Sequence, residues 1–135
     1  MFFKLTTDPL SLEDATSRLD LDGHGALVTF SGHIRPHDDF GHPLSHMEYE
    51  AYAEMAELEL AKLAETIAQR WGIRQLAILH RVGRVEVNEP SVVIAVAAGH
   101  RPEAFDACRY AIDELKRNVP LWKHEVLALR QTQPE

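Results

Sequence analysis

Hydrophobic positions recur at three- and four-residue steps in two stretches of the chain, and each stretch predicts a long amphipathic helix. In residues 53–71 the apolar stripe consists of Ala56, Leu60, Leu63, Ile67 and Trp71. In residues 101–118 it consists of Ala104, Phe105, Cys108, Ile112 and Leu115. Gly72 is a suitable C-terminal cap for the first helix. Pro120 ends the second near Asn118, because a proline excludes the residue before it from the helical region.

Apolar runs and alternating apolar and polar positions predict the strands. In chain order these strands span residues 2–5, 26–35, 44–52, 74–82, 84–87, 91–98 and 122–129. The run SVVIAVAA at 91–98 is almost continuously apolar, which is typical of a central strand. Ser11 predicts the N-cap of a further short helix with Leu12, Ala15 and Leu19 inward. Residues 130–135 show no pattern.

These elements predict an α+β fold in which a mixed or mainly antiparallel sheet packs with two long helices. Hairpin patterns at Gly83 and at residues 88–90 favour antiparallel neighbours. A length of 135 residues predicts one domain, residues 1–135.

The net charge of −7 argues against a general nucleic-acid-binding protein, because phosphate contacts require a basic face. No apolar run is long enough to span a membrane, and the N-terminus lacks the layout of a signal peptide. We therefore expect a cytoplasmic protein with no nucleic-acid or membrane partner.

The sulfur and histidine content limits the chemistry. The single cysteine, Cys108, excludes an intramolecular disulfide, and its place on an apolar stripe predicts a buried side chain rather than a nucleophile. A possible metal site is formed by His33, His37, His42, His46, Asp38 and Asp39. These side chains lack a rigid helical spacing such as HExxH, so we favour a solvated polar loop at residues 36–43 and expect no metal.

Four segments end in cationic side chains at chain corners. Arg35 ends a predicted strand, His100 and Arg101 open the second long helix, Lys116 lies in its last turn, and Lys123 follows the Pro120 corner. A helix dipole or simple solvation explains any one of them. Together, in an acidic chain, they predict a pocket for an anion.

Five motifs then carry a family resemblance. They are FSGHIR (30–35), MEYEAY (47–52) with Met55-Ala56, HRVG (80–83), AGHRPEAF (98–105) and IDELKRNVPLWKHE (112–125). In this order, over about residues 27–125, the chain resembles the large, catalytic subunit of molybdopterin synthase.

The resemblance implies an α/β-hammerhead fold and a homodimer within a heterotetramer. It implies a sulfurtransferase without a cofactor of its own, which converts cyclic pyranopterin monophosphate (precursor Z) to molybdopterin in molybdenum cofactor biosynthesis. The sulfur comes from the C-terminal thiocarboxylate of a small ubiquitin-like subunit. The implied substrate-binding residues are His33, Ile34, Arg35, His100, Arg101, Lys116, Lys123, His124 and Glu125.

Within this reaction we assign general acid/base catalysis to Lys116, because clustered cations favour a neutral amine on one of them. Lys123 is assigned to phosphate or oxyanion stabilisation, and His100 is a candidate to share the proton transfer. The alternatives are a non-catalytic sensor or carrier of a pterin or nucleotide phosphate, a partner-docking subunit without activity, and the histidine metal site.

Overall fold

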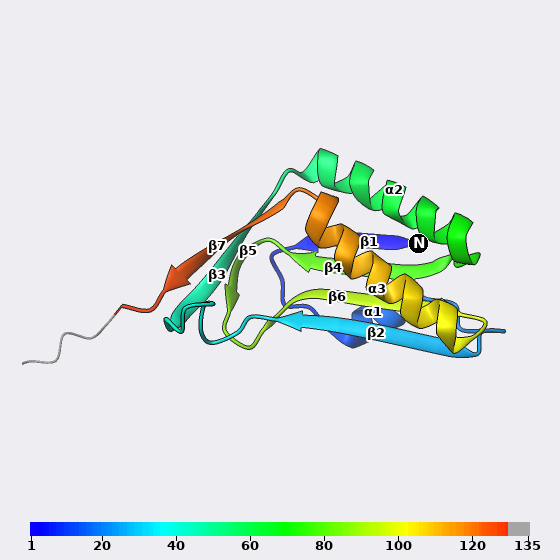
Figure 1. Cartoon of the computed structure of the whole chain (residues 1–135), viewed down its shortest axis with the longest axis horizontal. Coiled ribbons are helices and arrows are strands. Elements are labelled where there is room, and N and C mark those ends of the chain that lie inside the picture. The colour runs from blue at the N-terminus through cyan, green and yellow to red at the C-terminus, as the bar shows by residue number, and fades with distance from the viewer. Residues whose placement is uncertain (130–135) are drawn as a thin grey trace, which may run out of the picture.

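The computed structural model describes residues 1–129, and its strands form two sheets (Figure 1). The larger sheet has the strand order β1-β4-β6-β2. Its strands are β1 (Phe2–Thr6), β4 (Gln75–Arg81), β6 (Pro90–Ala98) and β2 (Ala26–His33). The pair β1 and β4 is parallel and the other pairs are antiparallel. The predicted α+β fold with a mixed sheet is confirmed. Residues 130–135 lie outside the described part of the chain.

The smaller, antiparallel sheet has the order β5-β3-β7. Its strands are β5 (Gly83–Glu86), β3 (Leu44–Ala51) and β7 (Leu121–Leu127). Gly83 separates β5 from β4 with φ +77°, a backbone conformation that glycine adopts without steric cost. The sequence pattern predicted one sheet; the chain instead forms two, and the smaller one extends away from the helices (Figure 1).

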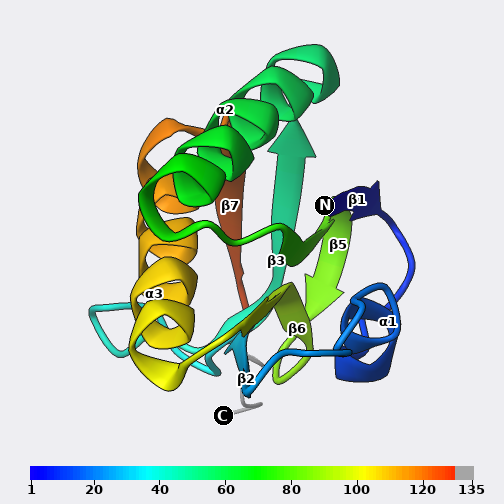
Figure 2. The same ribbon diagram turned by 90° about the vertical axis from the view of Figure 1, so that its right-hand side faces the viewer.

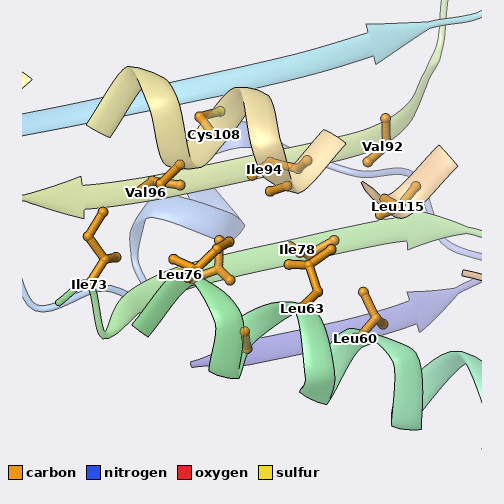
Figure 3. Packing of buried hydrophobic residues seen from close by; sticks show 14 of the residues in the cluster. Leu60, Leu63, Ile73, Leu76, Ile78, Val92, Ile94, Val96, Cys108 and Leu115 are labelled. Atoms are coloured by element: carbon orange, nitrogen blue, oxygen red, sulfur yellow. The ribbon is translucent and has the colours of Figure 1, made fainter. Parts of the chain in front are cut away.

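Two long helices, α2 (Ala53–Trp71) and α3 (Arg101–Asn118), cover one face of the larger sheet. The short helix α1 (Leu12–Thr16) packs on the other face, against a smaller apolar cluster (Figure 2). The main core lies between the two long helices and the sheet, where Cys108 points into the apolar layer with Ile94 and Val96 (Figure 3). The prediction that Cys108 is a core residue is confirmed. None of the helices within residues 1–129 is both long and apolar enough to cross a membrane.

Helix α3 begins and ends where the sequence predicted, but its buried face differs in part from the predicted apolar stripe. The helix stops at Asn118, and Val119 is extended (φ −81°, ψ 127°), as Pro120 requires. Phe105, predicted to face inward, is 60% exposed. The buried stripe is Ala104, Ala107, Cys108, Ala111 and Leu115. Phe105 follows Ala104 by one residue, which rotates it about 100° around the helix and away from the sheet.

One further prediction of side-chain orientation is wrong. Leu12 of α1 is 45% exposed, because a helix this short presents only Ala15 fully to the sheet. His46 of β3 is a polar residue in the core of the smaller sheet, where it is buried and hydrogen-bonds to Ser45 and Glu48. A partner on each ring nitrogen allows this polar side chain to be buried.

Candidate active site

A cavity of about 470 Å³ lies where the C-terminal end of α3 meets the end of β2 and the strands β3 and β7. This volume lies within the range typical of small-molecule sites. Its walls are formed by Phe30, Gly32, His33, Ile34, Arg35, His37, Leu44, Met47, Tyr49, His80, Ser91, Val92, Leu115, Lys116, Leu121, Lys123 and Glu125. The larger sheet and α3 therefore supply one side of the cavity, and the smaller sheet supplies the other.

The turn at Pro120 brings Lys116 and Lys123 to the same cavity. The chain leaves α3 through the extended Val119 and runs back along β3 as β7 (Figure 1). In this register Lys123 pairs with Tyr49 of β3. Within residues 1–129, neither lysine amine has an ion-pair partner. Both ammonium groups can therefore bind an anion without first breaking an ion pair.

Arg35 is the third cation at this cavity, and it already has a carboxylate partner. Its Nη2 donates to Oδ1 of Asp39 at 2.7 Å, and both side chains are largely exposed. This hydrogen bond raises the pKa of Arg35 above its ordinary value, with a further contribution from the charge of Asp39. Arg35 therefore stays charged, and an incoming anion would share the guanidinium with Asp39 or displace it.

Lys123, His124 and Glu125, three consecutive residues of β7 that were predicted to bind the substrate, do not all face the cavity. Lys123 and Glu125 line the cavity, whereas His124 between them does not. Successive side chains of a strand point to opposite faces, so His124 lies on the other face, where Nε2 is 3.9 Å from Oε2 of Glu50. The structure therefore brings Lys123 and Glu125 to the cavity but not His124.

His33 and Ile34 reach the cavity, but their polar groups have partners within the chain. Nδ1 of His33 lies 3.0 Å from the carbonyl oxygen of Asn88, and Nε2 lies 2.7 Å from Oγ of Ser31. Ile34 donates its N–H to Glu89 and accepts from the N–H of Asn88 through backbone atoms. These bonds join the end of β2 to the β5–β6 turn, and so fix the wall from which Arg35 extends.

His100 and Arg101 lie at the other end of α3. His100 is the N-cap residue, and neither side chain lines the cavity. At 1.5 Å of rise per residue, the helix separates them from Lys116 by roughly 25 Å. The prediction that Arg101 meets the other three cations in one cavity of the chain is therefore wrong. Their predicted role in substrate binding is not tested by this placement and stays a prediction.

The histidines near residues 36–43 form contacts with neighbouring side chains. Nδ1 of His42 lies 3.1 Å from Oδ2 of Asp38, while His46 contacts Glu48. In the part of the chain that the structure describes, no three histidine, cysteine or acidic side chains are grouped in a way that could hold a metal ion.

Sequence reasoning missed His80 and Tyr49 as cavity residues. Their rings meet edge to face, with centroids 5.0 Å apart. Both residues fall within motifs that carried the resemblance, but the alternation of β3 and the apolar character of β4 indicated strand positions only. A histidine inside an otherwise apolar strand was the one available indication of a polar wall.

The chain is similar in sequence and in structure to known proteins. Residues 5–118 match the family model of the MoaE protein. The molybdopterin synthase catalytic subunit of Nostoc sp. (strain PCC 7120) is 44% identical over 124 residues, which cover 91% of this chain and 74% of the relative. The crystal structure of molybdopterin synthase from Staphylococcus aureus superposes with a TM-score of 0.87 at 35% identity, covering 93% of this chain and 91% of that one.

A further solved structure is a complex of subunits 1 and 2 of molybdopterin-converting factor from Helicobacter pylori. It matches with a TM-score of 0.73 at 19% identity, covers 98% of this chain and 93% of that chain, and supports the fold alone. The resemblance drawn from the five motifs is confirmed. This chain belongs to the MoaE family, the family of the molybdopterin synthase catalytic subunits.

Proposed function

We propose that the cavity at the C-terminal end of α3 is where this member of the family makes molybdopterin from precursor Z, as the sulfurtransferase of molybdenum cofactor biosynthesis. The observation that carries the proposal is the meeting of Arg35, Lys116 and Lys123 at one cavity in a chain of net charge −7. Charge-assisted hydrogen bonds from these groups suit the phosphate of precursor Z. The apolar wall residues, such as Phe30 and Leu115, suit the ring system of the guest.

The sulfur has to come from another molecule. Burial raises the pKa of the Cys108 thiol to about 11, and Cys108 is the one cysteine of the chain. A buried, protonated thiol is a poor nucleophile. A small ubiquitin-like subunit with a C-terminal thiocarboxylate fits this requirement, and the Helicobacter pylori relative was solved as a complex of two subunits.

The two lysines take separate roles in the proposed reaction. The thiocarboxylate sulfur displaces an oxygen of the pterin side chain and forms a thioester, and water then cleaves the acyl–sulfur bond, so that the sulfur stays on the pterin and the tail leaves as a carboxylate. Negative charge develops on the acyl oxygen during this hydrolysis. Lys123 stabilises that oxyanion or the phosphate. Lys116 moves protons as general acid/base, a role that its position in the cavity wall and its freedom from an ion pair within residues 1–129 support.

His100 and Arg101 enter the proposal through a second copy of the chain. They lie too far from the cavity of their own chain to contact the same small guest. In the homodimer that we propose within the heterotetramer, they would act on the cavity of the partner copy. The free, buried cysteine is usual for a protein of a reducing compartment, and we extend the proposal to a cytoplasmic location.

A turnover assay tests the proposal. The protein is mixed with precursor Z and the thiocarboxylated small subunit, and molybdopterin is measured. We expect product with the intact small subunit and none when its last two glycines are removed. Binding of precursor Z without turnover would instead support the non-catalytic sensor or carrier, and docking of the small subunit without turnover would support an inactive partner subunit.

A further inference from the structure

His80 lies at the inner end of the cavity and is not used by the chemistry above. It belongs to β4, where it is flanked by Leu5 of β1 and Val92 of β6, and it is only 4% exposed. The side chain of Arg35 at the same cavity is 68% exposed. The cavity therefore has an outer, cationic part and a buried part in which an imidazole forms the wall.

The contacts of the ring determine its tautomer. Nδ1 lies 2.7 Å from the backbone carbonyl oxygen of Arg81. A carbonyl oxygen only accepts hydrogen bonds, so Nδ1 carries the hydrogen and Nε2 of the neutral ring carries a lone pair. Burial and, to a smaller extent, the positive charge of Lys116 together lower the pKa of His80 to about 4, so the ring is neutral at physiological pH.

The orientation of the ring is fixed, while its second nitrogen stays available. Tyr49 packs edge to face against the ring with centroids 5.0 Å apart, and the hydrogen bond from Nδ1 to the carbonyl oxygen of Arg81 fixes the rotation of the ring. Within residues 1–129, Nε2 has no hydrogen-bond partner, and it is not among the polar atoms sealed from solvent without a partner, which are Nε and Nη1 of Arg81. Nε2 therefore presents an acceptor to the cavity.

This acceptor differs from most of the polar groups around it. Arg35, Lys116 and Lys123 can only donate when charged. Ser91 donates its hydroxyl to the carbonyl of Gly32, and both ring nitrogens of His33 have partners. Glu125 is an acceptor, but it is exposed. A guest that bears an N–H or O–H donor as well as a phosphate would thus find at His80 a buried ring nitrogen whose lone pair is unused within residues 1–129.

We propose that His80 is a substrate-positioning residue whose Nε2 accepts a hydrogen bond from a ring N–H or hydroxyl of the guest, while the cationic groups hold the phosphate. The inference deepens the proposed function and rests on it. The contact would orient the heterocycle in the cavity, so that a phosphorylated molecule without such a donor binds less well. Such discrimination is expected because a buried acceptor left unpaired is costly.

Two substitutions separate the nitrogens of the ring. His80→Asn keeps an amide N–H near the position of Nδ1 and removes the acceptor at Nε2, whereas His80→Gln places an amide near Nε2. We expect His80→Asn to raise the KM for precursor Z by roughly 10-fold, the size of one lost hydrogen bond in a buried site, with kcat changed less. We expect His80→Gln to recover part of the loss. Competitive inhibition by inorganic phosphate should stay unchanged in both variants.

A measurement on the unmodified protein keeps the inference testable if a variant fails to fold. The nitrogen chemical shift of His80 Nε2 should move on addition of precursor Z and stay in place on addition of inorganic phosphate. Binding of precursor Z with an unmoved Nε2 signal would overturn the inference alone. A lower kcat with an unchanged KM in His80→Asn would also overturn it, because His80 would then act through Lys116. No binding of precursor Z to the wild-type protein would overturn the proposed function as well.

Discussion

The two ends of helix α3 carry the same kind of charge in different settings. Lys116 at the C-terminal end lines a cavity, because the chain turns at Pro120 and returns along β3 with Lys123. At the N-terminal end, His100 and Arg101 are exposed. The backbone there is packed closely, because a Cβ at Gly25 would lie 2.5 Å from the carbonyl oxygen of Gly99, but no segment of the same chain within residues 1–129 encloses the two cationic side chains. A cationic corner becomes a site only where a second segment encloses it.

The largest effect is expected from Lys116 itself. Lys116→Ala should lower kcat in the turnover assay by about 10²–10⁴-fold, the usual range for loss of a general acid or base. Arg109→Ala is the matched control, because it removes one exposed cation from the same helix outside the cavity. Near-normal turnover of Lys116→Ala would remove Lys116 from the mechanism.

A smaller loss is expected at Lys123, with its neighbour as the control. Lys123→Ala should lower kcat by about 10²-fold if it stabilises an oxyanion, and raise KM instead if it binds phosphate. His124→Ala should change neither constant by more than about twofold, because an exposed pair such as His124–Glu50 contributes little. An equal loss of turnover in Lys123→Ala and His124→Ala would show that a side chain of β7 need not face the cavity to act in the reaction.

A hybrid of two variants tests whether the N-terminal end of α3 acts in the second copy. Arg101→Ala and Lys116→Ala should each reduce turnover strongly as homodimers. After the two chains are mixed and re-associated, hybrid dimers should regain one intact site each, which restores up to about a quarter of wild-type activity in a random mixture. If the chains exchange between dimers and the hybrids still show no recovery of turnover, Arg101 does not complete the site of a partner copy.

The buried imidazole that faces Lys116 predicts a pH-dependent stability. Folding lowers the pKa of His80 from 6.5 to about 4, so between these values the unfolded chain binds the additional proton. Stability from this group is fully present above pH 6.5 and is lost as the pH falls towards 4. Between pH 7 and pH 5 the loss is about 2 kcal/mol.

Urea unfolding at the two pH values measures this loss. The free energy of unfolding of His80→Gln should fall by about 2 kcal/mol less than that of the wild-type protein, because glutamine does not titrate. The same fall in both proteins would contradict the assigned pKa of His80.

Local features of the fold were predictable from the sequence. The 3.6-residue period and the positions of Gly72 and Pro120 gave the extent of both long helices, and the apolar stripe placed Cys108 in the core. The spacing of apolar residues along a strand does not specify with which distant strand it pairs. The division into two sheets, which depends on β7 returning to β3, was therefore missed.

The candidate site was predictable in part for the same reason. Corners that end in Arg35, Lys116 and Lys123 were visible as cations beside proline and strand ends. Arg101 has the same local appearance, and only the length of the intervening helix separates it from them. The orientation of His80 depends on how β4 lies beside Tyr49 of a different sheet, which no local pattern contains.

The position of the phosphate of precursor Z in a crystal of the protein tests the central claim most directly. We predict that the phosphate lies within hydrogen-bond distance of at least two of Arg35, Lys116 and Lys123, with the heterocycle directed towards His80. A phosphate bound elsewhere on the molecule, with this cavity empty at saturating precursor Z, would contradict the account.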